Sequence, residues 1–320
     1  MVFRADASKN MGVGHVMRSI ALAEEAISQG ISCIFIGDLD GLKWLINKVE
    51  NIGFCEVYKH SNQFKPSKSH DILILDSYSI DESDNFLRRT NWKFVLCISD
   101  KKTPLYDCDL VLHSGLDLKW LSNCPYPYIG GADYVLMRNS IKKLNKKKSI
   151  KNEVTIIVSG GGTDPFGFSQ EVAKILDSYD LDMSVHFFSE TKIISKTKKA
   201  FFTHQFGNEF DQIAELADIA LTTASTNSIE FIAREIPTGI VCVTDNQAAN
   251  YNYFVENSLA APLGTYSSFS GWQLNRNVFT KLIQSPLYLE KLQVAIHGLI
   301  DLKGPSRVID FLRAQVDQGI

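Results

Sequence analysis

Apolar runs alternate with helix-spaced apolar positions up to about residue 135 of the chain. A very short apolar start and a polar loop precede a helix whose apolar face would carry Val16, Ile20, Ala23 and Ile27. Further strands are expected over 32–36, 72–75, 94–98 and 109–112, with a helix around 42–49. Because the runs at 72–75 and 94–98 are apolar on both faces, they fit a parallel sheet that is covered on both sides. The pattern predicts a doubly wound α/β domain.

A second α/β series follows the lysine-dense stretch 141–152, which is the best candidate for a linker. Such a charge run is typical of a solvated connector, and a phosphate- or nucleic-acid-binding arm is the alternative. Strands are expected over 154–158, 185–188, 219–221 and 239–243, and helices over 168–176, 208–216, 226–234, 247–256, 289–302 and 307–318. We therefore predict two Rossmann-like doubly wound parallel-sheet domains, 1–145 and 150–320, that face a cleft. The last helix is a candidate to pack back on the first domain.

Composition narrows the choice of partners. The formal net charge of −3 argues against a nucleic acid or an anionic membrane held by bulk electrostatics. The apolar runs are too short to span a bilayer, and residues 1–30 lack the pattern of a secretory signal, so no membrane anchor is expected. The six cysteines show neither a C-x-x-C pair nor a metal-like spacing. Reduced thiols in the cytoplasm are expected, and neither a metal site nor a cofactor is predicted.

The first candidate site is the stretch 4–18, which brings Gly12, Gly14 and His15 between a strand and a helix. Glycines let backbone N–H groups approach a ligand closely, and a helix N-terminus favours negative charge. A histidine in the first helical turn could then act on an anion-bearing molecule that docks there. The alternative is a histidine that only hydrogen-bonds a neighbouring carboxylate such as Asp6. The flanking glycines favour the functional interpretation.

A glycine-rich loop follows the strand expected at 154–158 and reads Ser159-Gly160-Gly161-Gly162-Thr163-Asp164-Pro165. Its three glycines and two hydroxyls can present several donors to a phosphate. No lysine follows in the G-x-x-x-x-G-K-[ST] spacing of a P-loop, which argues against ATP with magnesium. A plain strand-to-helix turn is the alternative.

Hydroxyl side chains crowd the strand end at 222–228, where the sequence reads Thr222-Thr223-Ala224-Ser225-Thr226-Asn227-Ser228. A helix cap needs one such residue, so the surplus favours donors for an anion at the helix N-terminus. Glu230, one turn further, could accept two hydrogen bonds from a ribose diol. The alternative is a capping box in which Thr226 or Asn227 pairs with Glu230.

Other polar side chains follow predicted strands and would therefore point at the cleft. In the first half these are Asp76, Ser77, Tyr78 and Asp100, for which buried salt bridges or helix caps are the alternative. In the second half Asn246 and Gln247 could contact sugar hydroxyls, or the turn could simply cap the next helix. The six other histidines form no group with metal-ligand spacing, and no G-x-S-x-G elbow occurs.

Taken in order, these stretches resemble the UDP-2,4-diacetamido-2,4,6-trideoxy-β-L-altropyranose hydrolases of pseudaminic acid biosynthesis. The most specific part is the opening R-x-D-x-S-x-x-M-G-x-G-H-x-x-R over 4–18. The resemblance continues through DSY, CDLVL, YVLMR, GGTDP, TNSIE and NQ, at 76–78, 108–112, 134–138, 161–165, 226–230 and 246–247. The chain departs from the family pattern at Asn139 and Ser140, where a glutamate and an apolar residue are usual, and at Ser99, where an aspartate is usual.

That family is similar to glycosyltransferases of the B fold, so the resemblance implies two Rossmann-like domains, with UDP held mainly by the second. It implies that His15 occupies the catalytic histidine position. Residues on the sugar side would be Arg4, Asp6, Gly12, Gly14, Arg18, Tyr78, Asp100, Arg138, Asn246 and Gln247. Residues on the nucleotide side would be Gly160, Gly161, Gly162, Thr163, Asp164, Ser225, Thr226, Asn227 and Glu230.

The implied reaction is hydrolysis of the anomeric C–O bond of the UDP-sugar. His15 would take a proton from water, which attacks the anomeric carbon opposite the diphosphate, with inversion. One alternative is a glycosyltransferase of the same fold that passes the sugar to a hydroxyl acceptor. Another is a nucleotide-sugar-binding module without turnover. Release of UDP from the UDP-sugar alone would distinguish hydrolysis from both alternatives.

Overall fold

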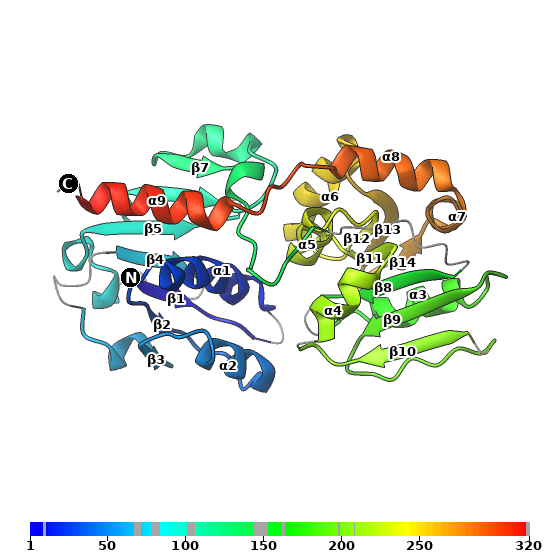
Figure 1. Cartoon of the computed structure of the whole chain (residues 1–320), viewed down its shortest axis with the longest axis horizontal. Coiled ribbons are helices and arrows are strands. Elements are labelled where there is room, and N and C mark those ends of the chain that lie inside the picture. Colours follow the sequence, from blue (N-terminus) through cyan, green and yellow to red (C-terminus); the bar gives the residue numbers. More distant parts are fainter. Residues whose placement is uncertain are drawn as a thin grey trace. The chain divides into compact units, whose positions relative to one another are not determined.

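The computed structural model describes residues 1–8, 11–66, 72–77, 84–100, 106–143, 153–161, 164–197, 199–207 and 209–317. The chain forms two compact units, one of Met1–Asn139 with Asp301–Ile320 and the other of Ser140–Ile300. Each unit contains a seven-stranded sheet with helices packed against it (Figure 1). The division falls at the start of the lysine-dense stretch, and residues 144–152 of that stretch lie outside the described ranges.

The first unit is built on strands β1 (Val2–Ala5), β2 (Ile34–Ile36), β3 (Glu56–Tyr58), β4 (Ile72–Asp76), β5 (Phe94–Ile98), β6 (Leu110–His113) and β7 (Tyr128–Gly130). They pair in parallel in the order β3-β2-β1-β4-β5-β6-β7. Its α-helices are α1 (Gly14–Ser28), α2 (Lys43–Glu50) and α9 (Gly304–Asp317). Short 3₁₀ helices occupy Ser61–Gln63, Asn85–Leu87, Arg89–Asn91, Lys119–Asn123 and Ala132–Tyr134.

Both faces of this sheet are covered, because β4 and β5 are buried along their whole length. One face packs against apolar side chains of α1, α2 and α9, and the other against side chains such as Phe86 and Trp92 near the 3₁₀ segments. Helix α9 lies beside α1 (Figure 1) and inserts Val308, Ile309 and Leu312 into the same core. The second unit therefore ends at residue 300, and α9, the helix that was the candidate to pack back on the first domain, belongs to the first unit.

The second unit repeats this architecture. Its strands are β8 (Val154–Ser159), β9 (Met183–Phe188), β10 (Ala200–His204), β11 (Ile219–Thr223), β12 (Thr238–Cys242), β13 (Ala261–Ser267) and β14 (Gly271–Leu274). Its helices are α3 (Phe168–Leu176), α4 (Glu209–Leu216), α5 (Thr226–Ala233), a 3₁₀ turn Asp245–Gln247, α6 (Ala248–Glu256), α7 (Arg276–Gln284) and α8 (Pro286–Ile296). The strand order is β10-β9-β8-β11-β12-β13-β14, with β14 antiparallel to β13.

Three details of the second unit differ from the expected elements. Strand β10, and likewise the hairpin β13–β14 with helix α7, occupy regions in which the sequence pattern predicted no strand or helix. Helix α8 ends at Ile296 instead of continuing to 302, because Gly298 adopts a left-handed φ of +69° that an α-helix cannot contain. Within the described ranges, no helix combines the length and the apolar content that crossing a membrane requires.

The predicted doubly wound parallel sheets are confirmed, and their strand order determines where ligands can approach. In each sheet the order reverses direction beside the first strand, between β1 and β4 in one unit and between β8 and β11 in the other. Ala5 pairs with Asp76 at the first of these points, and Ser159 pairs with Thr222 at the second. Ligands of doubly wound sheets bind at the carboxyl ends of strands at such points. The candidate sites of both halves lie there.

Candidate functional site

His15 lies in the first turn of α1, immediately after the loop that follows β1. Gly12 adopts a φ of +86° in this loop, a backbone conformation that glycine accepts more readily than any other residue. The N–H of Gly12 donates to the Ser8 carbonyl at 2.8 Å and closes the loop. The imidazole of His15 is buried, with only 7% of the residue exposed. A buried polar ring requires a partner, and the carboxyl end of β4 supplies one.

That partner is Asp76, whose carboxylate is fully buried. Nδ1 of His15 lies 2.6 Å from Asp76 Oδ1. Arg18, one helical turn beyond His15, donates from Nε to Asp76 Oδ2 at 3.0 Å and from Nη2 to Asp76 Oδ1 at 2.8 Å. Its remaining nitrogen, Nη1, donates to Asp100, which follows β5. A single chain of contacts therefore runs from His15 through Asp76 and Arg18 to Asp100.

The geometry selects one tautomer of neutral His15. A carboxylate oxygen can only accept, so the short contact to Asp76 requires a proton on Nδ1. Nη2 of Arg18 also lies 3.0 Å from Nδ1, but its proton has the Asp76 oxygen as an acceptor. With the opposite tautomer, two lone pairs would face each other at 2.6 Å. Nε2 is therefore left with a lone pair that can accept a proton.

Fixed charges surround this imidazole. Burial alone would lower the pKa of Arg18, but the carboxylates of Asp100 and Asp76 outweigh burial and raise that pKa above its usual value. Burial would likewise raise the pKa of Asp100, but Arg18 holds it well below the usual range, with smaller contributions from His15 and His113. Arg18 is therefore cationic and Asp100 anionic at neutral pH.

His113, at the end of β6, joins this group on the Asp100 side. Its Nδ1 lies 3.0 Å from the carbonyl oxygen of Ser99, so Nδ1 carries the proton, and its ring stands edge-on to Trp120 with centroids 5.5 Å apart. Burial lowers the pKa of His113, which keeps the ring neutral at physiological pH. Sequence reasoning overlooked this residue because it tested the other histidines only for metal-ligand spacing.

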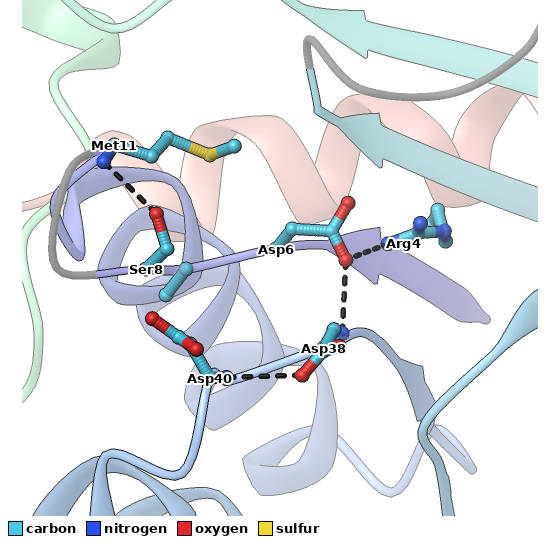
Figure 2. A pocket seen from close by; sticks show the side chains of 7 residues that line it. Arg4, Asp6, Ser8, Met11, Asp38 and Asp40 are labelled. Atoms are coloured by element: carbon cyan, nitrogen blue, oxygen red, sulfur yellow. Dashed lines mark hydrogen bonds and ion pairs between the residues drawn. The ribbon is translucent and has the colours of Figure 1, made fainter.

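A separate pocket of about 330 Å³ opens at the ends of β1 and β2 (Figure 2). It is lined by Arg4, Asp6, Ala7, Ser8, Met11, Asp38 and Asp40. The Asp6 carboxylate in its wall accepts from Arg4 Nη1 at 2.5 Å, from the Asp38 N–H at 2.9 Å and from the Ser77 hydroxyl at 2.8 Å. Burial would raise the pKa of Asp6, but Arg4 and the other donors outweigh it and lower that pKa.

These contacts assign Asp6 to a partner other than His15. The alternative interpretation of His15 placed it against Asp6, whereas the structure pairs it with Asp76. Asp6 instead ties the ends of β1, β2 and β4 together. Its neighbour Ser77 directly follows Asp76, so the pocket and the His15 group share adjacent residues of one strand end.

In the second unit, the hydroxyl-rich segment forms the start of α5. The helix begins at Thr226 with Ser225 as N-cap, and within the described residues the Ser225 side chain caps no helical N–H. Glu230 is then the fifth helical residue, so the capping box that the sequence offered as an alternative is not formed. Asn227 Nδ2 donates to Ser159 Oγ at 2.8 Å, which ties this helix start to the end of β8.

The glycine loop after β8 is shaped by Asp164. Its carboxylate accepts from the N–H groups of Phe168 and Ser169, both at 2.9 Å, and thereby caps α3. A Cβ on Gly160 would lie 1.9 Å from Asp164 Oδ1, so this cap leaves room only for glycine. Gly161 adopts a φ of +98°, and its N–H lies 3.4 Å from Ser159 Oγ. Gly162 and Thr163 lie outside the described residues.

The other predicted site residues have varied surroundings. Arg138 is buried in the first unit, and Tyr78 lies outside the described residues. Gln247 accepts from the Val243 N–H at 3.2 Å, and Asn246 accepts from the Thr244 hydroxyl, so both are held by their own turn in the second unit. Among the described residues, no three His, Cys, Asp or Glu side chains are grouped to hold a metal ion.

The two doubly wound units define a fold of the glycosyltransferase B type. Comparison with solved structures finds it in MurG of Acinetobacter baumannii, with a TM-score of 0.67 and 11% identity over 98% of this chain and 99% of that one. The same comparison finds this fold in the UDP co-structure of S. aureus MnaA. The TM-score is 0.66, and the identity is 9% over 99% of this chain and 96% of that one. No protein-family model matches the chain.

Two curated proteins are similar in sequence. An uncharacterized protein of Methanocaldococcus jannaschii is 25% identical over an alignment of 286 residues, which covers 78% of this chain and 57% of that protein. The UDP-2,4-diacetamido-2,4,6-trideoxy-β-L-altropyranose hydrolase of Campylobacter jejuni is 24% identical over 183 residues, which are 55% of this chain and 65% of the hydrolase. The chain thus spans less than two thirds of the length of either relative.

Proposed function

We propose that this protein is an enzyme acting on a UDP-sugar, and that it hydrolyses the anomeric C–O bond with His15 as general base. The observation that carries the proposal is the buried pair of His15 and Asp76, 2.6 Å apart, at the strand order reversal of the first sheet. Nε2 is left as a proton acceptor, as a general base near neutral pH requires. The substrate we propose is UDP-2,4-diacetamido-2,4,6-trideoxy-β-L-altropyranose, after the Campylobacter jejuni hydrolase.

The proposed step balances without a cofactor. A water oxygen attacks the anomeric carbon while its proton passes to Nε2 of His15, and the bond from the anomeric carbon to the diphosphate oxygen breaks. The electron pair of that bond leaves with UDP, which is a stable anion and needs no strong general acid. Attack opposite the leaving group gives a sugar of inverted anomeric configuration. His15 later returns its proton to solvent.

UDP would bind through the second unit. The first N–H groups of α5 and the loop at Ser159–Gly161 supply donors for a diphosphate, and the Ser225 side chain does not occupy the helix start as a cap. The UDP co-structure of S. aureus MnaA, which has the same fold, supports a UDP ligand. Glu230, buried one turn into α5, would accept from the ribose hydroxyls.

The test is release of UDP from the UDP-sugar in the absence of any acceptor. His15→Asn should retain UDP binding and lower turnover about 100-fold or more, the usual worth of a general base. His60→Asn is the matched control, because His60 is exposed and precedes a 3₁₀ helix of the same unit. Near-normal turnover of His15→Asn would remove His15 from the mechanism.

The same assay distinguishes the alternatives. Turnover that begins only when a hydroxyl acceptor is added would identify a glycosyltransferase, and conversion to an isomeric UDP-sugar would identify an epimerase. Binding of UDP without turnover of any diacetamido sugar would identify a binding module. NMR of the freshly released sugar reports the anomer and therefore inversion or retention.

A further inference from the structure

The charges around His15 are arranged in a row, not as a simple pair. Arg18 gives two of its nitrogens to Asp76 and the third to Asp100, while Asp76 also contacts His15. We infer that Asp100 is a positioning residue that favours the protonated form of His15 through Arg18 and Asp76. This inference rests on the proposed role of His15 as base.

The Asp100 carboxylate determines the net charge of the row of His15, Arg18, Asp76 and Asp100 after His15 takes up a proton. With a neutral His15, Arg18, Asp76 and Asp100 carry a net charge of −1, and uptake of a proton by the imidazole brings the group to zero. Without the Asp100 carboxylate, Arg18 would cancel Asp76, and proton uptake would leave a net charge of +1 in a buried group. A cation is disfavoured in such surroundings. Asp100 thus makes the state that follows proton abstraction the balanced one.

Arg18 would otherwise compete with His15 for the same carboxylate. Its Nη2 and the Nδ1 of His15 both contact Oδ1 of Asp76, at 2.8 and 2.6 Å. Asp100 engages Nη1 of Arg18 and compensates the guanidinium charge from the other side. The negative charge of Asp76 is then available to the imidazolium. Asp100 thus acts on His15 through Arg18 and Asp76 and through the electric field of its own charge.

Two further titratable groups described near this row, His113 and Asp6, do not alter the count. His113, beyond Asp100 at the end of β6, is neutral because burial lowers its pKa. Asp6, whose Oδ2 accepts from Ser77 next to Asp76, is compensated by Arg4 at 2.5 Å. Neither group therefore changes the charge that Asp100 contributes to the row. The Asp100 side chain is 39% exposed, so solvent screens it more than the fully buried Asp76.

The test is a histidine titration that needs no substrate. In protein labelled with ¹⁵N-histidine, the imidazole nitrogen shifts report both the tautomer and the titration midpoint, and the His15 signals are identified by their loss in His15→Asn. We expect a proton on Nδ1 at high pH in the wild type. Asp100→Asn should lower the midpoint of His15 so that the imidazole binds its proton about three- to tenfold more weakly.

Asp109→Asn is the matched control. Asp109 also pairs with an arginine, Arg89 at 2.9 Å, but it precedes β6 and so lies at the opposite end of the strands. It should leave the His15 midpoint unchanged, and Asp100→Glu, which keeps the charge, should stay close to the wild type. Asp100→Ser provides a second charge-removing variant if Asp100→Asn does not fold. An unchanged midpoint in the charge-removing variants, or a proton on Nε2 in the wild type, would overturn the inference.

Activity separates this inference from the proposed function. If UDP release occurs, the acidic limb of the kcat/KM profile of Asp100→Asn should move to lower pH by the same amount as the titration midpoint, because an imidazole that binds its proton more weakly stays neutral to lower pH. A midpoint that moves without any UDP release refutes the hydrolase and leaves the row intact. UDP release with an unmoved midpoint refutes the inference about Asp100 and leaves the proposed hydrolase function standing.

Discussion

Asp6 shows how one carboxylate can join three strand ends. It accepts from Arg4 of β1, from the N–H of Asp38 after β2 and from Ser77 after β4. Asp6→Asn removes the charge and at least one acceptor, and should cost about 1 to 3 kcal/mol of unfolding free energy at pH 7. Urea unfolding measures the loss, with Asp107→Asn, an exposed site, as the charge-matched control.

The contribution of Asp6 to the unfolding free energy should depend on pH. Arg4 and the other donors outweigh burial and lower the pKa of Asp6 in the folded protein. Its contribution is therefore complete above the unfolded value of about 3.9 and is lost as pH falls through the lower folded value. The difference in unfolding free energy between wild type and Asp6→Asn should be constant from pH 7 to about pH 5 and shrink below about pH 4. A difference that grows on acidification would contradict this account.

The residues around His15 differ in how far the sequence reveals them. The glycines of the opening motif and the helical spacing after them mark His15 as a candidate. Its partner Asp76 lies 61 positions away, and the sequence shows only a carboxylate after a buried strand. Which strand end meets which helix depends on the strand order, and the spacing of residues does not encode it. His113 directly follows the strand expected over 109–112, so its position was the same kind of signal that marked Asp76 and Asp100.

Two helix starts in the second unit differ in a way that substitution can test. Asp164 caps α3 through two hydrogen bonds, whereas the Ser225 side chain caps no N–H of α5 in the described structure. Asp164→Ala should therefore cost about 0.5 to 2 kcal/mol of unfolding free energy. Ser225→Ala should cost less, because it removes only the acceptor of the Thr223 hydroxyl, 3.0 Å away.

Binding of UDP should depend on Ser225 if α5 holds the diphosphate. Ser225→Ala removes a hydroxyl next to the open helix start and should weaken UDP binding about fivefold, the worth of about one hydrogen bond. Calorimetry of Ser225→Ala and the wild type gives the two affinities. Equal UDP affinity in Ser225→Ala and wild type would exclude this hydroxyl from the nucleotide site.

Elements with strong periodicity were predicted, and short edge elements were not. The buried strands β4, β5 and β8 and helices α3 and α5 fall where their apolar pattern placed them. Strands β3 and β7 have three residues each, and their side chains are largely exposed or half-buried, so no apolar run marks them. Such strands form because β2 and β6 offer unpaired edges to them. Pairing with a neighbour, and not local pattern, creates these elements.

At the scale of the whole molecule, the alternation of strands and helices was enough to predict the fold class. It offered the return of the chain to the first unit only as a candidate, without the residue at which it occurs, which is 301. Helix α9 carries an apolar stripe like any amphipathic helix, and such a stripe does not specify the surface that it covers. The core of the first unit is completed by residues about 280 positions away from the helix that they contact, as Gln29 and Asp310 also illustrate.

Leu312 is the residue through which this return can be tested. It is fully buried in the core of the first unit, together with α1. Leu312→Ala should cost about 2 to 5 kcal/mol, the range for deleting a buried leucine side chain. Leu287→Ala is the matched control, because Leu287 on α8 is 64% exposed and its truncation should cost little.

Hydrogen exchange shows which part of the protein Leu312→Ala destabilises. Because Leu312 packs in the core of the first unit, Leu312→Ala should reduce amide protection in β1, β4 and β5 and leave β8, β11 and β12 as protected as in the wild type. Exchange in the second sheet that accelerates to the same extent would mean that the two units unfold as one cooperative body. Loss of protection confined to α9 itself would mean that the helix frays without supporting the sheet, and that its buried stripe contributes little to the core.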